Sequence, residues 1–481
     1  MHQFRTKVAT VVAVSMGAIA VMLTHAAHAN AIPVDLIVSD AAVVVTMDPD
    51  RRVLSGASFA IRQGNIVAVG EGADIAARYY APQHIDARGK LVMPGLINTH
   101  THAAMTIFRG LADDLALDTW LNQHMWPAEA KYINAESVRI AGNLAFAEMI
   151  RSGTTTFNDM YFFSETLALA AKEAGMRALI GEGVLSFKTP SAANASQALA
   201  TTQRLAETWA GDRLISVAVA PHSIYATAPE ALQASKALAE RLELPLHIHI
   251  SETKKEVSDA QQRFGLTPFE HLNQLGFFDG DGAVVAAHAV HPTPSDIALM
   301  QARRVGVAHS PSSNMKLSSG IAPVPAMLAA GLTVGLGTDG AASNNGLNLF
   351  NDMRAAALLH KVATGDPTMM SARQTLESAT IGGAEVLGMQ NTIGSLEVGK
   401  RADLLLVDLN KPHLIPMYDP YSHIVYAMQA SDVHTVMIEG RLVMENRKLL
   451  TLDEDKVLSE AIALGAVIAA SAATPDQAVR P

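Results

Sequence analysis

The stretch Leu91-Val92-Met93-Pro94-Gly95-Leu96-Ile97-Asn98-Thr99-His100-Thr101-His102 is an apolar run that ends in two histidines one residue apart. Such a run predicts a buried strand, and strand side chains two positions apart point to the same face. His100 and His102 are therefore expected to face one cavity and to reach one ion. Neutral imidazole suits zinc, iron and nickel. The pair alone also fits two histidines at the end of a surface strand that bind no metal. The rest of the chain has to distinguish these two interpretations.

Downstream of this strand, apolar stretches alternate with helical patterns, which is typical of a parallel α/β fold. Strands are predicted at 91–100, 154–161, 177–185, 214–222, 244–251, 283–291, 306–310 and 333–339. Helical patterns separate them, for example at 135–151, 164–174, 229–241 and 267–275. This repetition favours a (β/α)8 TIM barrel over an open doubly wound sheet.

The two ends of the chain have a different, all-β pattern at 35–47, 57–69, 394–407 and 433–443. We expect these ends to form one small composite β-sandwich domain. The predicted division is a signal peptide at 1–29, sandwich segments at 30–93 and 390–450, a metal-dependent barrel at 94–389, and a C-terminal helix and tail at 451–481.

The N-terminus has the pattern of an export signal. Arg5 and Lys7 precede an apolar segment at 8–24, and Ala27-His28-Ala29 offers a small-residue cleavage site before Asn30. An uncleaved anchor is the alternative, because the apolar segment is slightly long for a signal core. We expect cleavage, and therefore a secreted protein or, in a bacterium, a periplasmic one without stable membrane insertion.

Composition narrows the chemistry and the partners. The 481 residues include no cysteine, which excludes disulfides, thiolate metal ligands and a cysteine nucleophile. The net charge is −10 and no basic run is present, so DNA and RNA are not expected as partners. A small-molecule substrate is expected, and homo-oligomers remain open.

Polar side chains follow the carboxyl ends of the predicted strands, where barrel enzymes place their active sites. They are His100, His102, Asp159, Glu182, His222, His249, Glu252, His288, His309 and Asp339. His249 lies nearer this edge than His247, which is expected to be a packed core residue. Glu252 is either a proton carrier beside a metal-bound water or a loop residue in solvent. Asp339 follows an apolar strand and can both bind a metal and accept a proton.

These motifs resemble those of the amidohydrolase superfamily. The resemblance rests on 94–102, 120–129, 158–161, 247–252, 287–291 and 337–345, and it covers about residues 34–450. Together the motifs look like the 5′-methylthioadenosine/S-adenosylhomocysteine deaminase group, close to the triazine hydrolases. They are highly specific for the superfamily and less specific for the substrate.

The resemblance implies a hydrolytic deaminase that converts adenosine-type nucleosides to the inosine analogue and ammonia. It assigns one divalent ion, zinc with iron(II) as the alternative, to His100, His102, His249 and Asp339. Glu252 is then the proton shuttle to the ring nitrogen, and His288 orients the attacking hydroxide. Predicted contacts to the nucleoside are Trp120, Glu129, His222, Glu252 and Ser343. Two-metal members carry a lysine at the end of strand four, and 216–222 contains none, so one ion is expected.

Alternative functions stay open beside this one. One is a hydrolase or chlorohydrolase of another amino-substituted heterocycle, such as a triazine or an oxidised purine, and the other is a non-catalytic binding relative. Among nucleosides, 5′-methylthioadenosine and adenosine are expected to be better substrates than S-adenosylhomocysteine. The reason is that Glu182, at the mouth of strand three, would oppose a substrate carboxylate, and that Lys188 is the one basic residue between Arg177 and Arg204.

Overall fold

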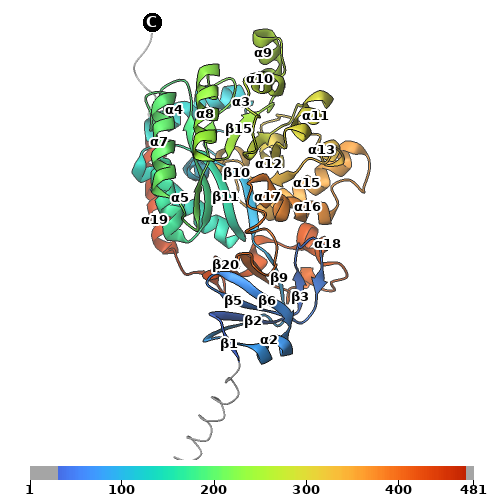
Figure 1. The fold of residues 1–481 in the computed structure, drawn as a ribbon. Coiled ribbons are helices and arrows are strands. Elements are labelled where there is room, and N and C mark those ends of the chain that lie inside the picture. Colours follow the sequence, from blue (N-terminus) through green and yellow to red (C-terminus); the bar gives the residue numbers. More distant parts are fainter. Residues whose placement is uncertain (1–30, 473–481) are drawn as a thin grey trace, which may run out of the picture.

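The structure is a computed structural model that describes residues 31–472. The predicted signal peptide and the tail residues 473–481 lie outside the described residues. Within 31–472, no helix has the length and apolarity that crossing a membrane requires. Figure 1 shows an α/β part in which helices surround parallel strands, and a β part at its lower side built from both ends of the chain.

The α/β part contains two parallel sheets. Their orders are β10-β11-β12-β13, with the short β14 paired to β12, and β15-β16-β17-β18. The bounds are β10 Leu96–Thr101, β11 Thr154–Tyr161, β12 Arg177–Val184, β13 Ile215–Val217, β14 Ala220–Pro221, β15 Leu246–Ile250, β16 Val284–His288, β17 Gly306–His309 and β18 Val334–Leu336. Backbone hydrogen bonds join the sheets at both ends: His247 N donates to Val219 O, and Asp339 N donates to His100 O, each at 3.0 Å. The α/β class is confirmed.

Helices connect these strands. The first two have the predicted bounds, and the predicted helices at 229–241 and 267–275 are present with ends shifted by one residue. The helices are α5 Ala135–Arg151, α6 Ser164–Ala174, α7 Ala195–Thr208, α8 Pro229–Leu242, α9 Lys254–Phe264, α10 Pro268–Gln274, α11 Pro294–Ala302, α12 Pro311–Lys316, α13 Val324–Ala329, α14 Ala341–Asn344, α15 Leu349–Thr364, α16 Ala372–Ala379 and α17 Ile381–Val386. Local signals explain the accuracy. Asn134 and Ser137 form a capping box at the start of α5, and α6 ends at Gly175 in the left-handed conformation.

The predicted strand 91–100 is in fact two strands. β9 (Lys90–Pro94) pairs with β19 (Leu404–Asp408) in a sheet of the chain ends, whereas β10 pairs with β11. Gly95 separates them, and a Cβ at this position would collide with the side chain of Thr155. Only glycine allows this close approach, so the chain can change sheets here.

Within residues 31–472 the β part contains two larger sheets, with orders β22-β21-β20-β19-β9-β3-β4 and β6-β5-β2-β8, and a two-stranded sheet of β1 (Ile32–Pro33) and β7 (Tyr79–Tyr80). Their remaining bounds are β2 Leu36–Ala41, β3 Val43–Val45, β4 Val53–Leu54, β5 Ala57–Arg62, β6 Asn65–Glu71, β8 Gln83–Asp86, β20 Val433–Ile438, β21 Arg441–Glu445 and β22 Lys448–Leu449. Phe59 and Leu404, from different sheets, belong to one buried apolar cluster. The last helix, α19 (Glu454–Ala472), returns to the α/β part beside α5 (Figure 1).

Candidate active site

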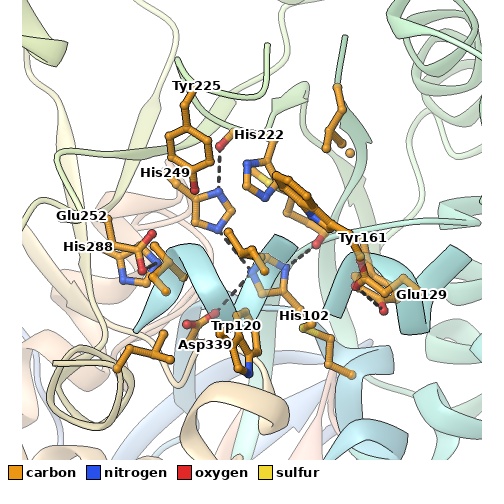
Figure 2. A pocket seen from close by; sticks show the side chains of 18 of the residues that line it. His102, Trp120, Glu129, Tyr161, His222, Tyr225, His249, Glu252, His288 and Asp339 are labelled. Atoms are coloured by element: carbon orange, nitrogen blue, oxygen red, sulfur yellow. Dashed lines mark hydrogen bonds and ion pairs between the residues drawn. The ribbon is translucent and has the colours of Figure 1, made fainter. Parts of the chain in front are cut away.

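Three histidines and one aspartate meet at the carboxyl ends of β10, β15 and β18, and Figure 2 shows three of the four, His102, His249 and Asp339. His102 Nε2 lies 3.2 Å from His249 Nε2, and Asp339 Oδ1 lies 3.2 Å from His102 Nε2 and 3.4 Å from His100 Nε2. A tetrahedral ion with bonds of about 2.0–2.1 Å places its ligand atoms roughly 3.3 Å apart. His100 Nε2 is buried and has no hydrogen-bond partner within residues 31–472. The cluster is therefore compatible with a metal site.

Two of these histidines are oriented by backbone carbonyls. His102 Nδ1 lies 2.5 Å from the carbonyl oxygen of Met160, and His249 Nδ1 lies 2.7 Å from that of His222. A carbonyl can only accept, so each Nδ1 carries the hydrogen and donates it. The Nε2 lone pairs then face the cluster, which is the usual arrangement for metal-binding imidazoles.

His247 orients the third histidine. It is buried, as predicted, but its Nε2 also lies 2.9 Å from His100 Nδ1. When His100 presents its Nε2 lone pair to a metal, its Nδ1 donates and His247 accepts.

We predict that His247→Phe, which removes the acceptor, weakens metal affinity by about 10–100-fold in a competitive chelator titration. His247→Gln retains an acceptor oxygen and should lose less, whereas equal losses in both variants would mean that only packing matters.

Asp339 is held by hydroxyl groups around its second oxygen. Asp339 Oδ2 accepts from Ser313 Oγ at 2.6 Å and from Ser343 Oγ at 2.8 Å. Ser343 is thus bound to Asp339 and is not among the residues that line the cavity, and its predicted contact with the substrate stays a prediction. The short helix α14 begins directly after Gly340 and turns the Ser343 hydroxyl back onto Asp339.

Glu252 and His288 form one wall of the cavity (Figure 2). His288 Nε2 lies 3.9 Å from Glu252 Oε1, and His288 Nδ1 lies 2.9 Å from Asn314 Oδ1. Glu252 is only 3% exposed, which excludes the alternative of a loop residue in solvent. Burial raises the pKa of Glu252, Asp339 raises it further, and His288 opposes the rise. A carboxyl group with a raised pKa is suited to proton transfer near neutral pH.

The backbone at this wall is unusual. Ser251, His288 and Asp339 have backbone φ angles of 52°, 71° and 60°. These lie in the left-handed region, which residues other than glycine rarely adopt. The N–H groups of Ser251 and Glu252 donate to the two carboxylate oxygens of Glu256, at 3.0 and 2.8 Å, and so fix this loop. Strained backbone of this kind gathers at functional sites.

The other predicted substrate contacts Trp120, Glu129 and His222 also line the cavity. Glu129 and Tyr161 lie across it from Glu252 and His288 (Figure 2). Tyr161 Oη donates to Glu129 Oε1 at 2.8 Å. Burial raises the pKa of Glu129 to about 7, although the hydrogen bond from Tyr161 lowers it. Trp120 Nε1 is buried and has no partner within 31–472.

Three other residues predicted at the strand ends do not line the cavity. Asp159 accepts a backbone N–H from the segment after β10, and Glu182 accepts the backbone N–H at the start of α6. His309 Nε2 lies 3.1 Å from His360 Nε2. Glu182 therefore does not oppose a substrate carboxylate, and the expected disadvantage of S-adenosylhomocysteine loses its basis.

The sequence analysis missed several residues that shape the site. They are Tyr161, Tyr225, Glu256, Ser313 and Asn314. Position at a strand end could have identified Tyr161, which ends β11, and the pair Ser313-Asn314, which follows β17 closely. Glu256 gives no such signal, because an acidic residue in the first turn of a helix is ordinary.

Residues 91–443 match the amidohydrolase family. The chain belongs to this family. A 5-methylthioadenosine/S-adenosylhomocysteine deaminase of Syntrophobacter fumaroxidans is 50% identical over 416 residues, which cover 86% of this chain and 94% of the relative. A 5′-deoxyadenosine deaminase of Methanosarcina acetivorans is 45% identical over 429 residues, covering 89% and 96%. The crystal structure of an adenosine deaminase from Xanthomonas campestris with bound zinc has a TM-score of 0.89 at 39% identity, covering 92% and 100%.

The family resemblance predicted from the motifs is thus confirmed, and the fold is that of amidohydrolases. The relatives match almost along their whole lengths, so the resemblance extends over most of the scaffold.

Proposed function

We propose that this protein is a metal-dependent hydrolase that deaminates adenosine-type nucleosides to the inosine analogue and ammonia. One observation carries the proposal: a single cavity has a metal-compatible cluster at one end, the buried Glu252 beside it, and the buried Glu129 on the opposite wall. A base fits between the first two groups, and a sugar with two neighbouring hydroxyls fits the carboxylate of Glu129. The names of the relatives support this reading.

The protein's residues divide the reaction among them. His100, His102, His249 and Asp339 would hold one divalent ion, zinc or alternatively iron(II). When bound, such an ion would lower the pKa of water to about 7 and so supply hydroxide at neutral pH. Glu252 gives a proton to the ring nitrogen next to the C–NH2 carbon, and His288 orients the nucleophile. Asp339 accepts the nucleophile's proton and passes it to the leaving ammonia.

We also propose a closed eight-stranded barrel with a composite β-sandwich, divided at 30–93, 94–389 and 390–450. The hydrogen bonds His247 N to Val219 O and Asp339 N to His100 O support closure at both joins. The apolar cluster shared by the two sheets of the chain ends supports a sandwich.

The test is ammonia release from purified protein with adenosine, 5′-methylthioadenosine, 5′-deoxyadenosine, S-adenosylhomocysteine, a pterin and an aminotriazine under one condition. Release from the adenosines is expected. If ammonia is released from the triazine or the pterin but from none of the adenosines, the protein is a hydrolase of another heterocycle and not a nucleoside deaminase. No turnover of any compound by the metal-loaded protein would favour the non-catalytic alternative.

A prediction concerns how Glu129 holds the sugar. Tyr161→Phe removes the hydroxyl group that fixes Glu129 Oε1. The KM for adenosine should rise by about tenfold with a smaller change in kcat, because a hydrogen bond to a charged group is lost from a binding residue. The matched substrate is 2′,3′-dideoxyadenosine, which lacks both hydroxyls and should show a much smaller rise in KM. Equal changes for the two substrates would place Tyr161 outside sugar recognition.

We further propose export through the predicted leader at 1–29, on the sequence pattern alone. Protein expressed with the full leader should be periplasmic and begin near Asn30, which N-terminal sequencing checks. A soluble cytoplasmic product that retains Met1 would contradict export.

A further inference from the structure

A second cavity adjoins the active site on its outer side. It has a volume of about 680 Å³, against about 50 Å³ for the inner cavity on the same measure. The two share a lining of Leu117, Leu121, Trp126, Tyr225 and Leu317. The inner cavity is therefore the narrower of the two, and the shared lining places the outer cavity directly beside it.

Aromatic rings line the way from the metal cluster into this outer cavity. The His222 ring lies 4.6 Å from that of His249, and the Trp126 ring lies 6.4 Å from His222 and 5.1 Å from Phe187. Tyr225 flanks the same path, 5.8 Å from His222. The last rings stay open to solvent, since Phe187 is 41% and Tyr225 37% exposed. Clustered exposed apolar side chains at a cavity mark a ligand-binding groove.

The charged residues around the outer cavity do not select for one sign. The exposed charged residues that line it are Lys254, Lys255, Asp118 and Asp259, and the buried Glu256 lines it as well. Lys255 is also paired with Asp259, at 2.6 Å between Nζ and Oδ2. The two exposed lysines and the two exposed aspartates of this rim balance in charge. The apolar wall rather than the rim therefore determines which ligands the outer cavity prefers.

We propose that the outer cavity is a subsite for large apolar 5′ substituents, aromatic ones in particular, and that Phe187 is its specificity-determining residue. The inference rests on the proposed nucleoside function. With the base against Glu252 and the sugar hydroxyls at Glu129, the 5′ carbon is the remaining point from which the ligand can extend. A substituent ring there meets Phe187 and Trp126, and aromatic pairs at such distances attract beyond their buried area.

The test compares kcat/KM for 5′-deoxy-5′-(phenylthio)adenosine, 5′-methylthioadenosine, adenosine and S-adenosylhomocysteine. The phenylthio compound should be used at least as well as the methylthio compound. Phe187→Ala should lower the ratio of kcat/KM for phenylthio over methylthio substrate by about tenfold. The matched control is Tyr418→Ala, because Tyr418 is a 90% exposed aromatic residue that lines neither cavity, and it should leave the ratio unchanged.

Three results would overturn the inference. One is rejection of the phenylthio compound by protein that deaminates adenosine, and another is an unchanged ratio in Phe187→Ala. The third is a preference for S-adenosylhomocysteine that Lys254→Ala removes, which would make the outer cavity a site for a charged tail. In each case activity on adenosine keeps the proposed function intact, whereas failure on every adenosine ends both.

Discussion

Glu252→Gln is expected to lower kcat for adenosine deamination by about 10²–10⁴-fold while metal content and fold stay unchanged. The amide has nearly the same size as the carboxyl group, so the buried wall beside His288 keeps its packing. It cannot carry a proton to the ring nitrogen, which must be protonated as hydroxide attacks. The raised pKa of Glu252, caused first by burial, makes it the suited proton carrier on this wall.

Steady-state kinetics, metal analysis and thermal unfolding of the same preparation check this expectation. The matched control is Glu256→Gln, because Glu256 accepts the backbone N–H groups of Ser251 and Glu252 but does not line the inner cavity. The control retains one acceptor oxygen and should lose much less activity. A near-normal rate in Glu252→Gln, or equal losses in both variants, would remove Glu252 from proton transfer.

Much of the scaffold followed from local sequence signals. The helices at 135–151 and 164–174 have the predicted bounds. The capping box that starts the first and Gly175 at the end of the second depend on neighbouring residues alone, whereas Glu182, 18 residues away, accepts the N–H at the start of the second. The break at Gly95 did not follow from the sequence. The apolar run continues across Gly95. The strand is divided there because of the Thr155 side chain, which is distant in sequence and against which only glycine fits.

The candidate site was predictable to the extent that strand ends determine it. Period-two spacing predicted that His100 and His102 share one face, and the common edge of parallel strands predicted that His249 and Asp339 lie near them. Position at a strand end does not say which way a side chain turns. Glu182 has the same apparent position as His222, yet it hydrogen-bonds the start of α6 while His222 lines the cavity. Ser343 likewise depends on a helix start that brings it back to Asp339.

Asp339→Ala is expected to abolish both metal binding and activity, and His100→Ala should do the same. Asp339 Oδ1 lies within 3.4 Å of both His100 Nε2 and His102 Nε2, and it is the anionic member of the cluster. Without it, neutral imidazoles alone face a divalent ion. The affinity for the metal should fall by more than roughly 10–100-fold, which is the cost of losing a residue that only hydrogen-bonds to a metal ligand. Elemental analysis should find about one ion per chain in the unaltered protein and almost none in the variants.

Asp339→Asn separates the two roles given to this residue. The amide keeps one oxygen that can face the ion, and its NH2 group then faces the hydroxyl oxygens of Ser313 and Ser343, which can accept from it, so part of the metal should remain. It cannot accept a proton from the nucleophile, so kcat should still fall by about 10²-fold or more in the metal-loaded variant. Ser343→Ala is the matched control, because it removes one hydrogen bond to Asp339 Oδ2 and leaves the carboxylate in place. Full activity in metal-loaded Asp339→Asn would restrict Asp339 to metal binding, and two tightly bound ions per chain would contradict the single-ion site.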